Sequence, residues 1–333
     1  MSIVVWQMRV LPLFVAIIAL GITFVGLRSL IPRLKRAGIT QRDMNKSSRP
    51  VVPDMGGIGT IVGFIFSVLF AVSFYSFYAS NLQFTFQVQE LLASLVTILI
   101  IAFLGTVDDL LNLRQLTKAL LPLVAAFPLM AVNAGSSTMN IPWIGQIDIG
   151  LIYPLLLIPI GITGAANAVN MLAAFNGLEM GMGLVATCSL GVIAYSMGQM
   201  ASLILLSAAA GAMLATLYFN WYPARLFIGN IGTYFIGAII AAAVIIGNFE
   251  WAGIIVMIPY CIDFIFKAMN RFPKSFGREV DGKLYCPTNR PVGLGQFIML
   301  VAHGISERKL VITLILLEAV CGLAAIIIFV VLR

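Results

Sequence analysis

The chain has 333 residues, of which 61% are hydrophobic and only 10% are charged, and its formal net charge is +7. A water-soluble globular domain carries about 25% charged residues, so this composition excludes that class and indicates a membrane protein. The four cysteines show no Cys-x-x-Cys spacing, which argues against a zinc site or a disulfide framework.

Apolar stretches long enough to cross a bilayer recur along the whole chain. The first begins near Val10 and has no small-residue cleavage site at its end, so we expect a retained helix. We predict an all-α polytopic membrane protein with about ten transmembrane helices in a single domain, residues 1–333. The expected spans are 10–31, 56–79, 90–107, 116–133, 149–166, 180–198, 201–219, 231–248, 252–269 and 309–332.

The segments between these spans fall into two sets that differ in charge. One set contains all of their Lys and Arg residues, and the other contains none. By the positive-inside rule the basic set faces the cytoplasm, and an even number of spans then puts both termini outside. The charge therefore reflects membrane topology, and we expect no nucleic-acid partner. The cytoplasmic set comprises 32–55, 108–115, 167–179, 220–230 and 270–308.

These cytoplasmic segments also hold most of the polar side chains, so we expect the active site at the cytoplasmic face. In the longest of them, Asp281-Gly282 lies between two short alternating runs, which predicts a β-hairpin.

The stretch IIAFLGTVDDLLNL, residues 100–113, contains two adjacent carboxylates, Asp108 and Asp109. They could form a solvated helix end, but carboxylates at membrane depth are costly and favour a functional role. Adjacent residues on a helix point about 100° apart, so we expect the pair to divide its roles between a metal and a reacting group. Lys118 could pair with these carboxylates or bind a phosphate.

Three asparagines follow in NAVNMLAAFNGLEMGMG, residues 167–183. Asn167, Asn170 and Asn176 could cap helices and form turns, or they could bind Mg²⁺ and a nucleobase. The glycine-rich residues 229–233 either bind an anion or allow close helix packing. Lys46 and Arg49 either anchor to lipid head groups or line a path for phosphate.

Five motifs occur in order along the chain: DMNKSSRPVVPDMGG, DDLLNLRQLTK, NAVNMLAAFNGLE, FIGNIGTYFIG and GISERKL. Together they resemble the polyprenyl-phosphate N-acetylhexosamine-1-phosphate transferase family, especially its eukaryotic and archaeal branch, which uses UDP-GlcNAc and dolichyl phosphate. The resemblance implies ten helices and a cytoplasmic active site. It also implies transfer of a sugar-1-phosphate from a UDP-sugar to a membrane polyprenyl or dolichyl phosphate, with release of UMP. The implied cofactor is Mg²⁺, with Mn²⁺ as an alternative.

The resemblance further implies roles for individual residues. Asp108, Asp109 and Lys118 match catalytic positions, and Asn170 matches a Mg²⁺ ligand. Asn176 matches the amide that reads uracil, and Phe227 matches the aromatic ring that stacks on it. The full set of implied substrate-binding residues is Arg42, Asp43, Met44, Asp54, Asn112, Asn167, Asn176, Phe227, Ser306 and Arg308.

Two departures from the family pattern refine this expectation. Asn230 stands where the family usually has a metal-binding Asp, so we expect weaker metal binding in the absence of nucleotide. Segment 270–308 holds a single histidine, His303, instead of the histidine-rich motif of the bacterial cell-wall enzymes, which favours a UDP-GlcNAc-like donor.

We therefore expect the first step of lipid-linked glycan assembly, of the N-glycan type. The alternatives are a multi-span transporter of an anionic or phosphorylated substrate and a lipid-interacting scaffold. Direct attack and a covalent aspartyl intermediate both stay open, as does a homodimer. The membrane would be the plasma membrane in a prokaryote or archaeon and the endoplasmic reticulum in a eukaryote.

Overall fold

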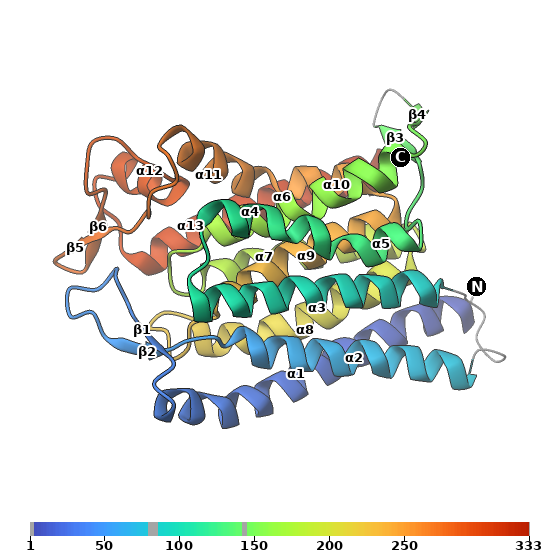
Figure 1. Ribbon diagram of the computed structural model, residues 1–333, viewed down its shortest axis with the longest axis horizontal. Helices are drawn as coiled ribbons and strands as arrows, with labels where there is room; N and C mark the ends of the chain where they lie inside the picture. Colours follow the sequence, from blue (N-terminus) through green and yellow to red (C-terminus); the bar gives the residue numbers. More distant parts are fainter. Residues whose placement is uncertain (1–2, 79–85, 142–144, 333) are drawn as a thin grey trace.

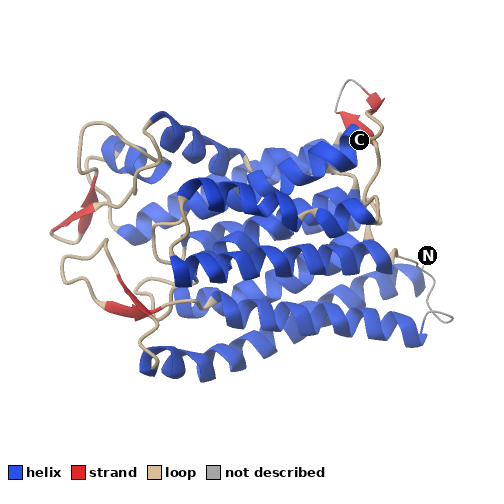
Figure 2. Cartoon of the chain, viewed as in Figure 1, coloured by secondary structure: helices blue, strands red, loops and turns tan. Residues whose placement is uncertain are grey.

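The computed structural model describes residues 3–78, 86–141 and 145–332, and long helices running side by side make up most of them (Figures 1 and 2). The helices are α1 (Ile3–Arg36), α2 (Gly57–Tyr78), α3 (Val88–Leu111), α4 (Gln115–Ala125), α5 (Phe127–Ala131), α6 (Ile158–Leu172), α7 (Leu178–Ser196), α8 (Met200–Asn220), α9 (Gly229–Gly247), α10 (Glu250–Val256), α11 (Ile258–Met269), α12 (Leu294–Val301) and α13 (Glu307–Ile326). Two π-helical turns, Tyr153–Leu157 and Ile327–Val331, extend α6 and α13.

Eight of the described helical segments are long and apolar enough to cross a membrane. The count becomes nine if α10 and α11, which meet at an angle of 60°, form one broken span. The predicted span 116–133 is a shorter apolar segment made of α4 and α5. A proline lies in the first turn of both α5 and α11, where a missing N–H does not cost a helical hydrogen bond.

The predicted span 149–166 begins and ends too early. The helical segment runs from Tyr153 to Leu172, so Asn167 and Asn170 lie on α6 and not in a loop. A helix in the membrane tolerates these amides because both side chains contact protein: Asn167 bonds to α4, and Asn170 bonds to α9.

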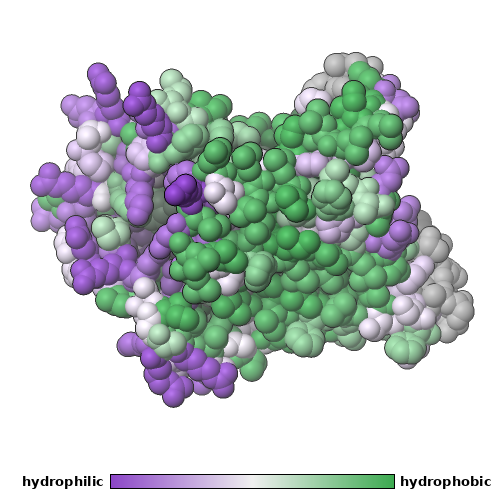
Figure 3. Space-filling view, in the orientation of Figure 1, coloured by the Kyte–Doolittle hydropathy of each residue, from purple (hydrophilic) through white to green (hydrophobic). Residues whose placement is uncertain are grey.

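The two ends of the helix bundle differ in character. Hydrophobic residues cover the middle of the face seen in Figure 3, and hydrophilic residues gather at the end that holds β1, β2, β5 and β6. The N-terminal end of α1 and the C-terminal end of the helix formed by α13 both lie at the opposite end of the bundle (Figure 1). The antiparallel strand pairs are β1 (Thr40–Arg42) with β2 (Val51–Pro53), β3 (Thr138–Ile141) with β4 (Gly145–Asp148), and β5 (Arg278–Val280) with β6 (Lys283–Tyr285).

The predicted hairpin around Asp281-Gly282 is confirmed. Asp281 has a φ of 49° and Gly282 a φ of 74°, between the paired strands β5 and β6. Positive φ at both central residues is what a two-residue type I′ turn requires, and Asp-Gly adopts it readily.

Helix α9 lies at the centre of the bundle and contacts α2, α3, α6, α7, α8 and α10. Glycines on two neighbours let them approach its first turn. A Cβ on Gly105 of α3 would lie 2.7 Å from the Cα of Ile231, and one on Gly57 of α2 would lie 2.6 Å from the nitrogen of Gly232. Any larger residue would push these helices apart. Gly105 thereby brings the end of α3, one turn further on, against the start of α9.

Candidate active site

The adjacent aspartates at the end of α3 both contact the start of α9, but they use different partners. Asp109 accepts hydrogen bonds from the backbone N–H groups of Asn230 (2.9 Å) and Ile231 (3.2 Å). First-turn N–H groups lack partners within their own helix and favour a negative charge. Asp108 instead accepts the side-chain amide of Asn230 at 2.9 Å. The two carboxylates thus have different partners, and their expected division between a metal and a reacting group stays a prediction.

Lys118 pairs with Asp108, the first of its two expected roles, while phosphate binding stays a prediction. Its Nζ lies 3.0 and 2.9 Å from the two carboxylate oxygens of Asp108. The N–H of Leu113 also donates to Asp108 at 3.0 Å, so this carboxylate holds the turn between α3 and α4. Asp108 is buried, whereas 21% of the Lys118 side chain is exposed. The lysine therefore keeps a face on which it can meet an anion.

Asn170 and Asn230, the two predicted metal ligands, lie on facing helices and are linked through one hydroxyl. Thr233 Oγ1 lies 2.7 Å from Asn170 Oδ1 and 3.0 Å from the backbone oxygen of Asn230. The amide nitrogen of Asn230 is turned toward Asp108, which leaves its side-chain oxygen free of that bond.

The oxygen atoms of this group suit a magnesium ion that also binds substrate. Within the described residues, no cluster of three or more His, Cys, Asp or Glu side chains could hold a metal alone. Asp109, Asn170 and Asn230 nevertheless line one cavity and offer carboxylate and amide oxygens. Mg²⁺ prefers such hard ligands and is usually held by a few protein oxygens together with substrate phosphates. The residues present therefore fit Mg²⁺.

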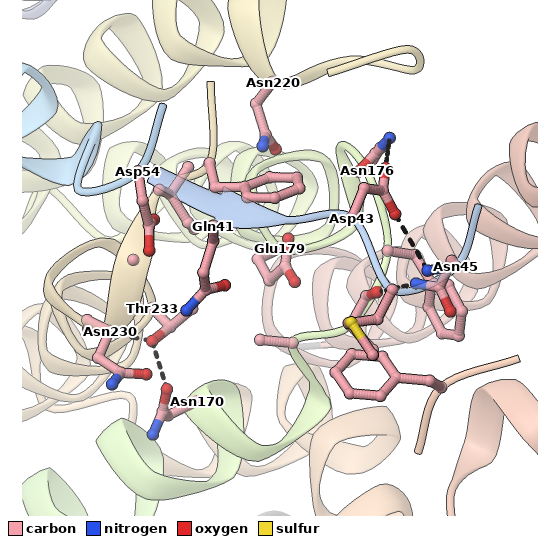
Figure 4. A pocket seen from close by; sticks show the side chains of 18 of the residues that line it. Gln41, Asp43, Asn45, Asp54, Asn170, Asn176, Glu179, Asn220, Asn230 and Thr233 are labelled. Atoms are coloured by element: carbon pink, nitrogen blue, oxygen red, sulfur yellow. Dashed lines mark hydrogen bonds between the residues drawn. The ribbon is translucent and has the colours of Figure 1, made fainter. Parts of the chain in front are cut away.

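This cavity, of about 230 Å³, lies at the hydrophilic end of the bundle, between β1, the start of α9 and the turn that joins α6 to α7 (Figure 4). Polar side chains from these separate segments converge on it. The predicted site residues that line it are Arg42, Asp43, Met44, Asp54, Asp109, Asn170, Asn176, Phe227 and Asn230.

The other predicted site residues do not line this cavity. Asp108 connects to the cavity through its bond with Asn230, and Lys118 pairs with Asp108. Asn167 donates to the backbone oxygens of Ala119 (3.2 Å) and Thr163 (2.9 Å), which ties α6 to α4. Asn112 is exposed and ends α3 with a φ of 49°. Ser306 precedes the first turn of α13, and Arg308 is exposed.

A buried ionic network, absent from the predicted set apart from Asp43 and Asn176, fixes one wall of the cavity. Lys46 pairs with Asp43 at 2.9 Å and with Glu307, the first residue of α13. Glu307 also accepts the backbone N–H of Asn176 at 2.9 Å, and Asp43 accepts the side-chain amide of Asn176 at 3.1 Å. Sequence reasoning missed Glu307 because a lone acid beside a basic GISERKL segment gives no signal of its distant partner.

Electrostatics favour the charged form of this lysine. Burial lowers the pKa of Lys46, but Glu307 and Asp43 outweigh burial and leave that pKa above its usual value. Its ammonium group also lies 4.6 Å from the ring centre of Tyr222, a cation–π contact. Lys46 is therefore a cation at neutral pH, and its contacts hold the loop after β1 in place.

Besides Thr233, four more polar residues line the cavity although the sequence did not single them out. Asn45 donates to the backbone oxygen of Ala174 and accepts the N–H of Gly277 at 2.9 Å, joining two segments of the wall. Glu179 is buried in the first turn of α7. The four residues are Gln41, Asn45, Glu179 and Asn220.

Asp54 faces the same cavity from the loop before α2. Burial raises the pKa of the Asp54 carboxyl group, and the N–H of Met55, which donates to it at 2.7 Å, offsets this in part. Asp54 is also an electrostatic neighbour of Asp109.

A second cavity, of about 490 Å³, is almost entirely apolar and lies between α6, α9, α10 and α11. Gly161, Gly164 and Phe264 are among its lining residues. Glu250, its charged lining residue, lies at the end far from the first cavity and accepts a hydrogen bond from Tyr153. This cavity, called the apolar groove below, extends along α6 to Ala168, two residues before Asn170.

Residues 91–248 match the model of glycosyl transferase family 4. A protein of Saccharolobus solfataricus is 37% identical over 96% of this chain and 98% of its own length. The chain belongs to glycosyl transferase family 4. That relative carries the provisional name UDP-N-acetylglucosamine–dolichyl-phosphate N-acetylglucosaminephosphotransferase.

More distant relatives match most of the chain as well. A Dictyostelium discoideum protein bearing the same enzyme name is 27% identical over 90% of this chain and 84% of its own length. A Bacillus subtilis protein, provisionally named an undecaprenyl-phosphate N-acetylglucosaminyl 1-phosphate transferase, is 24% identical over 96% of this chain and 86% of its own length. The family resemblance inferred from the five motifs is confirmed.

Proposed function

We propose that this protein transfers N-acetylglucosamine-1-phosphate from UDP-N-acetylglucosamine to a membrane polyprenyl or dolichyl phosphate and releases UMP. The observation that carries this proposal is the cavity at the hydrophilic end of the bundle. Its Asp109–Asn170–Asn230 side offers oxygen ligands, and its Asn176–Phe227 side offers an amide and an aromatic ring. The names of its relatives support the same donor and acceptor.

The nucleobase side favours uracil by its hydrogen-bonding pattern. Asp43 can only accept from Asn176, so the amide nitrogen must face Asp43 and the amide oxygen is left for a ligand. The N3–H of uracil is a donor that suits this oxygen, whereas cytosine carries an unprotonated nitrogen there. Phe227 provides a ring against which the base can stack.

The diphosphate side needs a cation, because the cavity is acidic and the donor is anionic. Arg42 is the basic residue among the described lining residues, against the acids Asp43, Asp54, Asp109 and Glu179. Mg²⁺ held by Asn170, Asn230 and Asp109 would offset the charge on the diphosphate. Lys118 would neutralise the incoming lipid phosphate from the other side of Asn230.

The apolar groove suits the acceptor's isoprenoid chain. A lipid in this groove would lie along α6 with its phosphate toward Asn170, where it can meet the donor. An oxygen of the lipid phosphate would then form a bond to the sugar-linked phosphorus, and the bond from that phosphorus to UMP would break. Both aspartates already accept two or more hydrogen bonds, which weakens them as nucleophiles and favours direct attack.

This function requires the hydrophilic end to face the cytoplasm, where nucleotide sugars are. The uneven distribution of Lys and Arg among the loops supports that orientation, with ten spans and both termini outside. The protein would then begin lipid-linked glycan assembly in a plasma membrane or in the endoplasmic reticulum.

The deciding experiment is a donor screen with purified protein, polyprenyl phosphate and a panel of UDP-sugars, with UMP as the readout. We expect UMP release with UDP-N-acetylglucosamine, only when lipid phosphate is present, and loss of release in Asp109→Asn. Release by Asp109→Asn at the wild-type rate would contradict the site assignment. Uptake of donor into sealed vesicles without UMP release would favour a transporter. Exchange of labelled UMP into the donor without lipid would favour a covalent intermediate.

A further inference from the structure

The cavity of about 230 Å³ is called the donor cavity below. Asn220, the last residue of α8, connects two of its walls through one buried side chain. Its Oδ1 accepts the backbone N–H of Gly177 at 3.1 Å. Its Nδ2 donates to the backbone oxygen of Leu226 at 2.9 Å. The residue is only 2% exposed, so neither bond competes with bulk water. Each bond ends one residue away from a group assigned to the donor's base.

Those neighbours are Asn176, before Gly177, and Phe227, after Leu226. We propose that Asn220 is a positioning residue, which fixes the separation of Asn176 and Phe227 and so sets the affinity and selectivity for the nucleobase. This inference rests on the proposed function, since it takes the base-binding roles of Asn176 and Phe227 from it. Figure 4 shows Asn220 on the same side of the cavity as Asn176, apart from Asn170 and Asn230.

Each wall also has contacts of its own, and Asn220 joins the two walls through a single side chain. The N–H of Phe227 donates to the oxygen of Pro53, and the N–H of Gly56 donates to the oxygen of Phe227, both at 2.8 Å. On the opposite wall, Gly177 has a φ of 84°, and a Cβ there would lie 2.8 Å from the Trp221 ring. The turn that carries Asn176 is thus pressed against the residue that follows Asn220.

The chemistry of the position requires an amide. One end of the side chain must accept from an N–H and the other must donate to a carbonyl, and asparagine supplies both at this length. Aspartate keeps the acceptor for Gly177 but places a carboxylate against the carbonyl of Leu226. Leucine keeps the approximate volume and removes both bonds, leaving two buried backbone groups without partners.

The test compares Asn220→Asp and Asn220→Leu with wild type, using calorimetric binding of UMP and steady-state kinetics. Loss of a buried hydrogen bond predicts about tenfold weaker UMP binding and a correspondingly higher KM for the UDP-sugar. The KM for polyprenyl phosphate should not change, because Asn220 contacts no part of the groove. The matched control is Thr216→Val, one turn earlier on α8, which removes a buried bond to Thr60 (2.7 Å) and should leave UMP binding intact.

A double-mutant cycle with Phe227→Leu separates positioning from general stability. If Asn220 acts through Phe227, Asn220→Asp should weaken UMP binding much less in the Phe227→Leu background than in wild type. Additive effects, or equal loss of affinity in Thr216→Val, would overturn the proposal. Should Asn220→Leu fail to fold, Asn220→Asp and the cycle still decide. A wild-type protein that neither binds nor releases UMP refutes the proposed function and this inference together. Wild-type binding with unaltered Asn220 variants refutes only the inference.

Discussion

The side-chain amide of Asn230 donates to the carboxylate of Asp108 at 2.9 Å, across the contact between α9 and α3. A carboxylate at position 230 could not make this bond, because both groups would only accept. The amide therefore lets the site assemble without a cation between the two side chains, and it leaves one oxygen available for a metal.

Asn230→Asp should make the site depend on the metal. Without Mg²⁺, two carboxylates would face each other, and we expect the free energy of unfolding to fall by about 1–3 kcal/mol. With Mg²⁺ the variant should regain stability, and half-maximal activity should need less Mg²⁺ than in wild type. Thermal unfolding and activity over a Mg²⁺ titration measure both effects. Asn170→Asp, which keeps its bond from Thr233, is the control and should not lose metal-free stability. Identical titrations for Asn230→Asp and wild type would refute this prediction.

Lys118→Met should slow the reaction without weakening donor binding. Lys118 pairs with Asp108 but does not line the donor cavity, so we expect kcat to drop about a hundredfold while UMP binding stays near wild type. Single-turnover rates and calorimetry with UMP separate the two quantities. Arg114→Met, an exposed cation in the same loop, should behave as wild type. A loss of UMP affinity in Lys118→Met would show that the lysine binds the donor instead.

Asp43→Asn should reduce discrimination between uracil and cytosine nucleotides. An amide at position 43 can accept or donate, so the amide of Asn176 would no longer be held in one orientation. We expect the preference for UMP over CMP to fall by about tenfold, chiefly through tighter CMP binding. Competition of the two nucleotides against a labelled uridine analogue provides the measurement. An unchanged preference would mean that another group reads the base.

Lys46→Met should destabilise the protein by about 3 kcal/mol at neutral pH, because Asp43 and Glu307 lose their buried cation. The pKa of Lys46 is raised above its ordinary value of 10.5 in the folded protein. Its stabilising effect should thus be complete below pH 10.5 and vanish as the pH rises through the folded-state pKa. Unfolding midpoints of wild type and variant from pH 8 to alkaline pH should converge. A gap that stays constant to the highest pH would refute this account.

Gly164→Leu should impair use of long-chain acceptors. Gly164 lines the apolar groove, and a Cβ there meets no atom within 4 Å, so the larger side chain narrows the groove without a clash. We expect the KM for polyprenyl phosphate to rise about tenfold while the KM for the UDP-sugar is unaffected. Gly191→Leu on α7, which also has no atom within 4 Å of its Cβ, is the matched control outside the groove. Equal effects of the two substitutions would show that the groove does not hold the acceptor.

The sequence predicted the features that rest on local chemistry. Apolar length identified most spans, and Asp281-Gly282 identified its hairpin, because both depend on neighbouring residues alone. The convergence of Asp109, Asn170 and Asn230 on one cavity agrees with the family motifs.

The remaining features depend on contacts between distant segments. Glu307 and Asn220 occupy ordinary helix ends, and their partners lie on other elements, so no local pattern marks them. The span ending at 166 was predicted too short because Asn167 and Asn170 are polar in sequence but face protein in the structure. The same packing shows why these two asparagines, three residues apart, do not share a role: one binds α4 and the other meets the cavity.

The enclosure of α9 also bears on how the protein is made. In its apolar window, 89% of the residues are buried in protein, so this helix would find few of its final contacts in lipid. Its neighbours α2, α3, α6, α7 and α8 precede it in the chain and leave the ribosome first, whereas α10 follows it. When α9 arrives, its first-turn N–H groups donate hydrogen bonds to Asp109, and the side-chain amide of Asn230 donates one to Asp108. The order of synthesis thus makes the arrival of a single helix the event that gives both aspartates their partners on α9, while the cavity wall held by Glu307 forms later.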